Sequence, residues 1–311
     1  MNNIFGGGEF HKPPDDKRTI LRKAMYSAQP VLSDFLGYPD FPENKILADQ
    51  KYLNAKIGNI ALGAQSSSDD DYARDMEPIL TYILNTGVLL PSRTNFSFLA
   101  SDYDDKFNGT DIVFGVQNKK TKDNMLFSVD VATGTLLKSI QSKFENSLDR
   151  HDGVSNIDYC IYKDQRWSET DTPHFILGMS PASQDKAFEK IRIENGELKG
   201  RDEDLDTDFI VLSEIKEQIE MQLSILVKKP RIESIENRIA KLSDLMPAIG
   251  SGLYRTLGIN ASDFSSKVER KKVFTEKYNQ KANKLLPLDD VYKNIVYESN
   301  RREDLFKNNS R

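Results

Sequence analysis

Two neighbouring segments of the chain alternate between apolar and polar or small residues, and together they predict a β-hairpin. They are residues 110–116 (TDIVFGV) and 125–131 (MLFSVDV), with a polar turn between them. A turn centred on that polar stretch pairs Phe114 with Phe127, and the numbers of every other pair also sum to 241. Since side chains alternate along a strand, one face of this hairpin is expected to be core and the other to end in acidic residues.

The same register places Asp111 directly opposite Asp130. Opposed side chains on adjacent strands have Cβ atoms about 4.5–5.5 Å apart, and like charges there are destabilising. A divalent cation would compensate them, because hard cations are bound by carboxylate oxygens. Asp130 interrupts an otherwise buried strand, so the open alternatives are an Arg or Lys partner or a cap on a backbone N–H.

The remaining pattern predicts a mixed α/β layer. Residues 30–60 are mixed in pattern, with turn signals, and 163–172 read as a polar loop. Acidic residues at 69–71 open a helix in which Pro78 marks either a kink or the true start. The predicted elements are helices at 16–28, from 66–71 to about 84, 135–148 and 181–192, and strands at 96–100, 110–116, 125–132, 155–162 and 174–179.

The C-terminal third reads as helical. Apolar residues recur every three or four positions on both sides of a Lys-Lys-Pro turn, which predicts an antiparallel helical hairpin over 207–247. Its apolar stripes are expected to be buried within the chain, with a homodimer through them as the alternative. The predicted organisation is a disordered segment 1–16, an α/β core 17–200 and a helical region 201–311 that contains the hairpin.

Charge and composition narrow the function classes. The net charge is −5, which argues against a dedicated nucleic-acid binder, yet residues 251–311 carry 13 Lys and Arg against 8 Asp and Glu. An acidic half beside a basic region suits an enzyme that processes a polyanion. No apolar stretch approaches a membrane span and no signal pattern opens the chain, so a cytoplasmic protein is expected. The single Cys160 excludes an internal disulfide.

The order of the predicted elements and the placement of the acids resemble the PD-(D/E)xK, restriction-endonuclease-like nuclease superfamily, over about residues 70–192. That family has an α-β-β-β-α-β core with an Asp near the second strand and an Asp/Glu-x-Lys on the third. Asp111 and Asp130 match the two acids, and Glu77 is placed to match the glutamate that many members carry on the first helix. The resemblance implies a mixed sheet of this topology.

The motif lysine departs from the family pattern, since Ala132 stands two residues after Asp130. Some relatives carry this lysine on the following helix, which points to Lys138, with Lys143 as the second choice. The implied activity is a Mg²⁺- or Mn²⁺-dependent nuclease, a phosphodiester hydrolase acting on DNA or RNA. Asp111, Asp130 and Glu77 would hold the metal, and Asp105, in the loop before the second strand, is a further metal ligand in this hypothesis.

Rival chemistries fit less well. The segment Gly178-Met-Ser-Pro-Ala182 looks like a nucleophile elbow, but Pro181 has no N–H to donate to an oxyanion, so Ser180 is expected to cap a helix instead. The three histidines have no paired spacing for zinc. The alternative function, from another class, is a non-catalytic interaction protein that dimerises or binds a partner through the 207–247 hairpin.

Overall fold

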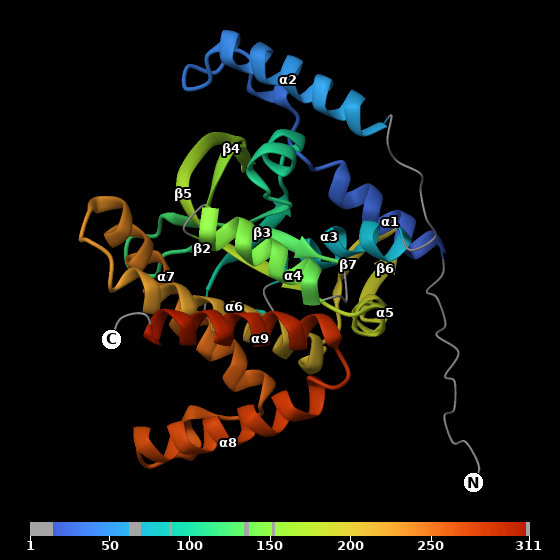
Figure 1. The fold of residues 1–311 in the computed structure, drawn as a ribbon. Coiled ribbons are helices and arrows are strands. Elements are labelled where there is room, and N and C mark those ends of the chain that lie inside the picture. Colours follow the sequence, from blue (N-terminus) through green and yellow to red (C-terminus); the bar gives the residue numbers. More distant parts are fainter. Residues whose placement is uncertain are drawn as a thin grey trace.

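A five-stranded mixed β-sheet forms the centre of the computed structural model of this chain (Figure 1). The structure describes residues 15–61, 70–86, 89–91, 93–133, 137–150 and 153–308. In spatial order the strands are β1 (Asn95–Leu99), β2 (Ile112–Gln117), β3 (Asn124–Ala132), β5 (Gln165–Gly178) and β4 (Val154–Tyr162). Helices cover both faces, so the fold is mixed α+β. Residues 1–14, most of the segment predicted to be disordered, lie outside the described residues.

The antiparallel meander β1-β2-β3 has the predicted register. Phe114 pairs with Phe127 and Ile112 with Val129, as the sum of 241 requires. Side chains on one face of these strands join the main core, while Val113 and Leu126 point to the other face, where β4 contributes Ile157 and Cys160. The division of the hairpin into two faces is therefore confirmed.

The helices around the sheet largely follow the predictions. Helix α3 (Asp70–Asn85) includes Pro78 in its interior, so the reading of Pro78 as the start of the helix is wrong. Helix α4 (Leu137–Phe144) continues into the π-helical segment η3 (Glu145–Arg150). The other two predicted helices of the core region are α1 (Asp15–Tyr26) and α5 (Pro181–Glu189).

Strand β5 is much longer than predicted. It begins at Gln165, so the polar run predicted to be a loop forms its first half and pairs with β4. Lys163 and Asp164 make the connecting turn with positive φ angles of 50° and 62°. Farther along, β5 runs parallel to β3 from the pair Ser128–His174 onward. That ladder begins directly after Pro173, a residue that has no N–H to donate to it.

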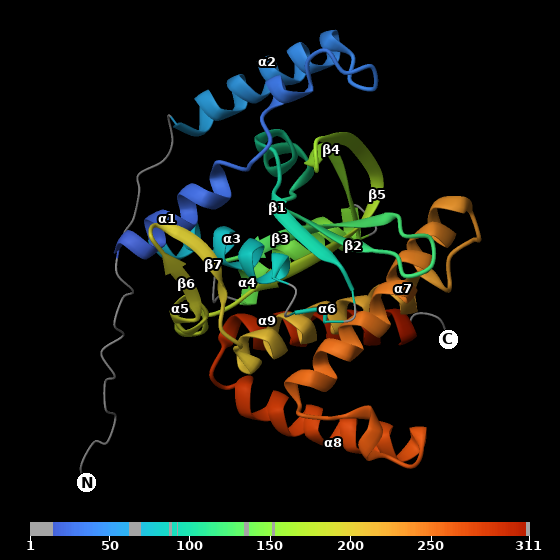
Figure 2. The same ribbon diagram turned by 180° about the vertical axis from the view of Figure 1, so that it is seen from behind.

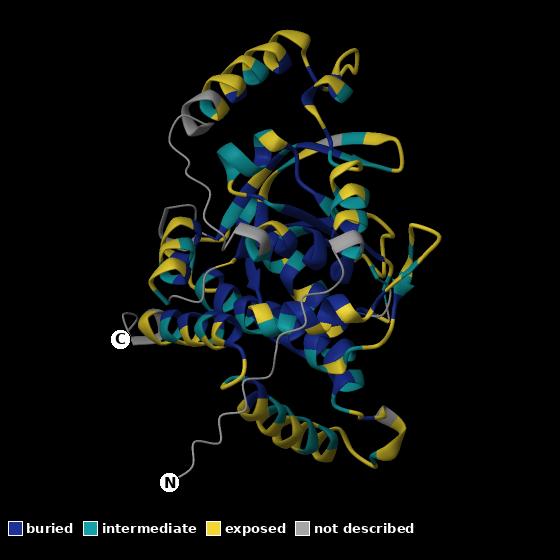
Figure 3. Cartoon of the chain, turned by 90° about the vertical axis from the view of Figure 1, so that its right-hand side faces the viewer, coloured by how far each residue is buried: buried dark blue, intermediate teal, exposed yellow. Residues whose placement is uncertain are grey.

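Two further parts of the chain fold into elements that were not predicted. Residues 30–60 form the short 3₁₀ helix η1 (Leu32–Phe35) and helix α2 (Glu43–Ala61), which is anchored by Ile46 and Leu53 and otherwise largely exposed (Figure 3). A small hairpin, β6 (Ile191–Glu194) and β7 (Glu197–Arg201), follows α5. Its turn is Asn195-Gly196, with φ angles of 53° and 77°. An Asn-Gly pair is a strong hairpin signal, and the sequence interpretation missed it.

The predicted helical hairpin is present as α6 (Leu205–Leu226) and α7 (Glu233–Thr256), followed by η4 (Ala261–Asp263), α8 (Lys267–Leu285) and α9 (Asp290–Asn308). Ile219 of α6 and Leu242 of α7 are fully buried in the core of the same chain. The apolar stripes are therefore used within the chain, and a homodimer through this hairpin stays a prediction. None of the described helices is both long and apolar enough to cross a lipid bilayer.

Helix α6 also closes the open edge of β5. The Gln218 amide accepts a hydrogen bond from Ile176 N (2.8 Å) and donates one to Ile176 O (2.7 Å). Gln222 donates to His174 O (2.7 Å), and Glu214 accepts from Gly178 N (3.1 Å). These side chains thus pair the backbone groups of β5 that no neighbouring strand reaches. An uncovered edge could otherwise pair with a strand of another molecule.

We predict that Gln218→Leu lowers the free energy of unfolding by about 2–4 kcal/mol, because it leaves a buried N–H and a buried C=O without partners. Urea denaturation measures the change. The matched control is Gln280→Leu on the exposed surface of α8, which should alter stability by less than about 0.5 kcal/mol. Equal effects of the two substitutions would contradict the role given to Gln218.

Candidate active site

Four acidic side chains gather where β2 begins, at the end of β3 that the hairpin turn does not occupy. Asp111 directly precedes β2, and Asp130 lies in β3. Glu77 comes from α3. Asp105 comes from η2 (Asp104–Asn108), a π-helix of one turn that leads into β2. The structure therefore brings together all four acids that the sequence predicted for the site.

The backbone holds Asp111 in place. Its N–H donates to Val129 O (2.8 Å), and its carboxylate accepts from Val131 N (2.6 Å). Burial raises the pKa of Asp111 well above its usual range, and the negative charges of Asp130 and Glu77 raise it further. Asp111 and Asp130 are thus close enough to repel each other, as the hairpin register predicted.

Lys143 of α4 forms an ion pair with Asp130. Burial would lower the pKa of this lysine, but the carboxylates of Asp130 and Asp111 outweigh that effect and raise it. Lys138, the first choice from the sequence, is exposed on the same helix. Helix geometry explains the difference, because α4 buries Ile140 and Phe144. At about 100° per residue, Lys143 lies about 60° from Ile140 around the helix, whereas Lys138 lies about 160° from it.

Glu77 is a half-buried carboxylate with an unusual proton affinity. Burial raises its pKa to about 7, and Asp105 adds to the increase, while Lys106, a hydrogen bond with Tyr26 and Lys143 oppose it. Burial raises the pKa of Tyr26 to about 12, and the nearby Glu77 contributes to this increase. Near neutral pH this carboxyl group can therefore either hold a proton or accept one.

Two neighbouring aspartates in the loop before β2, Asp105 and Asp104, have different surroundings. Asp105 is ion-paired with Lys106 and faces Glu77. Asp104 is fully buried and structural: it accepts hydrogen bonds from Ser101 Oγ (2.7 Å), Asn108 Nδ2 (2.7 Å) and Asp158 N (2.7 Å). Burial raises the pKa of Asp104 to about 6, although these hydrogen bonds lower it. Gly109 ends the turn with a left-handed φ of 64°.

The sequence reasoning missed two residues of the cluster. Lys106 directly follows Asp105 in the loop before β2, and this position beside a predicted metal ligand is the one signal in the sequence that could have identified it. Tyr26 lies at the end of α1, and nothing in the sequence indicates that α1 approaches α3 at this point. Burial would lower the pKa of Lys106, but Asp105, Asp111 and Glu77 raise it, which places its charge among the carboxylates.

The rival sites have structural explanations. Ser180 caps α5, and its hydroxyl accepts from Ser183 N (3.3 Å), as predicted. His174 is buried and its Nδ1 lies 2.7 Å from Ser128 Oγ. Cys160 is a fully buried thiol whose pKa burial raises. The backbone of Trp167 pairs with Cys160, and its side chain lies outside what the structure describes.

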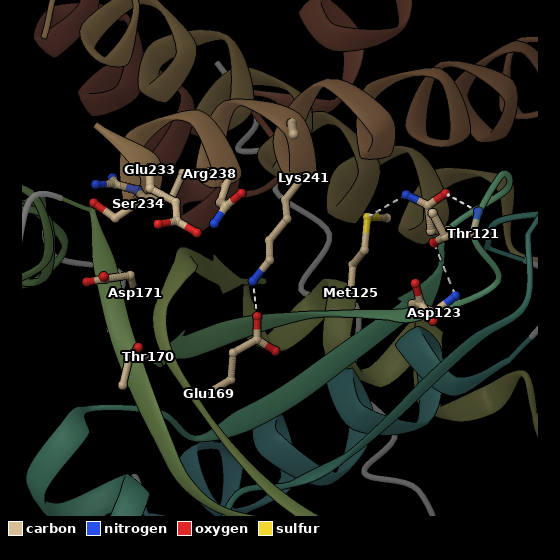
Figure 4. Close-up of a pocket in the computed structure, with 13 residues that line it drawn as sticks. Thr121, Asp123, Met125, Glu169, Thr170, Asp171, Glu233, Ser234, Arg238 and Lys241 are labelled. Atoms are coloured by element: carbon tan, nitrogen blue, oxygen red, sulfur yellow. Dashed lines mark hydrogen bonds and ion pairs between the residues drawn. The ribbon is translucent and has the colours of Figure 1, made fainter. Parts of the chain in front are cut away.

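A separate hollow of about 550 Å³ opens under α7, close to where the parallel ladder of β3 and β5 begins (Figure 4). Lys241 points from α7 across this space and pairs with Glu169 of β5. Burial lowers the pKa of Lys241 to about 8. None of the residues that the sequence predicted for the site lines this hollow.

Carboxylate oxygens are the kind of ligand that hard divalent cations take. Asp111, Asp130 and Glu77 carry up to three negative charges next to the ammonium group of Lys143, and burial together with the charges of Asp130 and Glu77 raises the pKa of Asp111. Each carboxylate is engaged by a protein donor, and among the described residues no three or more His, Cys, Asp or Glu side chains are arranged to hold a metal ion. Mg²⁺ commonly needs only one or two carboxylates besides water and phosphate oxygens.

Comparison with known proteins gives no relationship: no family model, no curated protein and no solved structure matches this chain.

The raised pKa of Glu77 predicts a stability change with pH. The unfolded carboxyl group ionises near 4.5 and the folded one near 7, so its contribution is fully present below pH 4.5 and is lost as the pH rises through 7. We expect Glu77→Gln to raise the free energy of unfolding by about 1–2 kcal/mol at about pH 8 and to change little near pH 4.

Urea denaturation across this pH range measures the effect. Glu276→Gln, on the exposed face of α8, is the control and should leave the pH profile of the parent unchanged. A Glu77→Gln protein that is no more stable than the parent above pH 7 would contradict the burial-driven shift.

Proposed function

We propose that this chain is a metal-dependent phosphodiester hydrolase that acts on nucleic acid. The observation that carries the proposal is the convergence of Asp111, Asp130, Glu77 and the lysine paired with Asp130, Lys143, at one end of the β2–β3 hairpin. An acidic cluster held together against its own repulsion costs folding free energy, and such costs are typical of functional sites.

The order of elements supports the restriction-endonuclease-like core. Helix α3 is followed by the meander β1-β2-β3, then by α4, and then by β5, which lies parallel to β3. Strand β4 is an addition at the outer edge. Asp111 stands at the start of the second strand of this unit and Asp130 near the end of the third, where the resemblance to the nuclease superfamily expects its two acids.

In this proposal Asp111 and Asp130 hold Mg²⁺ or Mn²⁺, with Glu77 as an additional ligand, directly or through water. The bound metal ion would lower the pKa of a water molecule and offset negative charge on the phosphate. The residues of the chain do the rest. The ammonium group of Lys143 stands beside Asp130, where it would stabilise charge developing on the phosphate oxygens.

Glu77 is suited to accept the proton of the attacking water. A general base works best when its pKa lies near the working pH, and without metal the pKa of Glu77 is about 7. Glu77 would take this role where it meets the metal ion through water and not as a direct ligand. In this proposal Lys143 takes the place of the lysine that the nuclease superfamily carries two residues after the second acid, and it does so from α4. The product would be a cut phosphodiester strand, with the attacking oxygen joined to phosphorus and the leaving oxygen protonated.

We expect Asp111→Asn, Asp130→Asn and Lys143→Met each to lower the rate of Mg²⁺- or Mn²⁺-dependent cleavage of DNA or RNA by about a hundredfold or more. Each Asn variant loses a carboxylate that would hold the metal ion, and Lys143→Met loses the cation that would offset charge on the phosphate. The matched control is Lys138→Met on the same helix, which should cleave like the parent.

Cleavage of labelled single-stranded and duplex substrates, followed on gels, measures this prediction. Circular dichroism confirms that the variants are folded. Loss of activity in Lys138→Met with full activity in Lys143→Met would reverse the assignment of the lysine, and metal-dependent cleavage by Asp130→Asn at the parental rate would refute the proposal.

The proposal also predicts opposite effects of Asp111→Asn on stability and on metal binding. Without metal, the amide oxygen can still accept from Val131 N while the repulsion with Asp130 disappears, so we expect a gain of about 1–2 kcal/mol in unfolding free energy. With Mn²⁺ at about a hundred times its dissociation constant, the parent should gain about 2.7 kcal/mol and the variant nothing. Thermal denaturation with and without metal tests both; a parent that Mn²⁺ does not stabilise would contradict the metal site.

A further inference from the structure

The basic charge of the C-terminal region is concentrated on one helix. Helix α8 carries seven Lys and Arg against two Glu, whereas the remaining residues of 251–311 carry six of each sign. The excess of +5 in the C-terminal region therefore lies entirely on α8, in a chain whose net charge is −5. Figures 1 and 2 show α8 at the end of the molecule opposite to α2, outside α9 and α6.

Aromatic side chains hold α8 against the body. Phe274 packs on Tyr254 of α7 and Tyr278 on Phe209 of α6, with ring centroids 4.8 and 5.2 Å apart. Lys281 is used on this inner side as well, pairing with Asp206 at 3.0 Å. The inner face of α8 is thus fixed by specific contacts from Phe274 onward, and the residues of its first turns, before Phe274, are largely exposed.

The first turns of α8 present lysines without internal partners. Lys267, Lys271 and Lys272 are exposed, and within the part of the chain that the structure describes they form no ion pair and no side-chain hydrogen bond. Two exposed carboxylates, Glu269 and Glu276, stand among them, together with uncharged hydrogen-bonding groups such as Thr275 and Asn279. Lysines interspersed with such groups match the contacts that proteins make with the phosphates of nucleic acids.

A hollow of about 650 Å³ adjoins the first turns of α8. Its lining includes Tyr254, Arg255, Gly250, Asn260 and Arg270, and no carboxylate. The Arg270 guanidinium lies over the Tyr254 ring at 5.8 Å, whereas Arg255 is held by Glu203 (3.1 Å) and Asp208 (2.5 Å). By contrast, four carboxylates line the hollow under α7. The hollow beside α8 therefore suits an anionic ligand that carries a flat ring.

We infer that the first turns of α8 and the hollow beside them form a second nucleic-acid contact, in which Lys267, Lys271 and Lys272 bind backbone phosphates and the Tyr254–Arg270 hollow receives a nucleobase. This inference rests on the proposed function for its partner class and adds a binding surface remote from the acidic cluster. A base can stack on an aromatic ring or a guanidinium plane whatever its identity, so the contact would be independent of sequence.

The composition of the exposed turns of α8 favours nucleic acid over a membrane surface. A helix that binds in a lipid interface needs a broad apolar face turned outward. On α8 the exposed large apolar side chain is Val268, and the aromatic residues point inward. Anionic vesicles are therefore the competing partner that the experiment must include.

The test measures binding of a labelled DNA oligonucleotide, single-stranded and duplex, by fluorescence anisotropy in EDTA, where cleavage cannot occur. The variant changes Lys267, Lys271 and Lys272 to Gln. The matched control changes Lys119, Lys120 and Lys122, three exposed lysines of the β2–β3 turn, to Gln, which removes the same charge elsewhere. We expect the α8 variant to bind about tenfold more weakly or worse, and its slope of log K against log salt on the duplex to be shallower by about three. The turn variant should bind like the parent.

The hollow has its own pair of variants. A Cβ at Gly250 would meet no atom within 4 Å, so Gly250→Leu partly fills the space and Gly250→Ala is the control. The inference predicts weaker binding of the single strand by Gly250→Leu and parental binding by Gly250→Ala. Parental binding by Gly250→Leu would remove the hollow from the contact.

The outcomes separate this inference from the proposed function. Equal weakening in the α8 and turn variants, parental binding in both, or α8-dependent binding to anionic vesicles without binding to DNA would each overturn the inference, whether or not the parent cleaves. Weakening confined to the α8 variant, in a parent that shows no metal-dependent cleavage, would support the inference and remove the nuclease proposal.

Discussion

The register of one hairpin determines the chemistry at the centre of this molecule. Because β2 and β3 pair so that Ile112 faces Val129, Asp111 lies just beyond the end of the ladder, where the charge of Asp130 acts on it. Burial raises the pKa of Asp111, the charges of Asp130 and Glu77 raise it further, and the ammonium group of Lys143 pairs with Asp130. A shift of one residue in this register would send one carboxylate to the opposite face of the sheet and dissolve the cluster. The buried pairs Phe114–Phe127 and Val116–Met125 hold the register against the repulsion between Asp111 and Asp130.

The sequence was sufficient for this hairpin because its signal is local: two alternating runs, one polar turn and a period of two. The helical hairpin of α6 and α7 was predictable for the same reason. The choice between Lys138 and Lys143 was not, because it depends on the rotation of α4, which the packing of Ile140 and Phe144 fixes against the sheet and α9. Tyr26 and Glu77 meet through the packing of α1 on α3, which leaves no mark in the spacing of residues. The first half of β5 was missed because its strand pairs with β4 at a polar surface, where no apolar alternation reveals it.

Closure of the sheet edge and distribution of charge link the site to the rest of the fold. The amides of Gln218 and Gln222 satisfy β5 where no strand follows, which fixes α6 to the sheet and thereby places α7, α8 and α9. The acids gather at one end of the β2–β3 hairpin, while the excess basic charge stands on α8, outside α9. A polyanion would be attracted by the second region and repelled by the first unless cations neutralise it. The nuclease proposal and the α8 contact therefore rest on different residues and share only the class of partner, a nucleic acid.

A crystal structure with Mn²⁺ would show whether Asp111 and Asp130 together bind a divalent cation, as we propose. We expect an anomalous difference peak in contact with carboxylate oxygens of both residues, with Lys143 displaced from or shared with the metal-bound Asp130. A crystal soaked to saturation that shows both carboxylates unchanged, with Asp130 still paired to Lys143 and no peak between them, would refute a metal site at these residues.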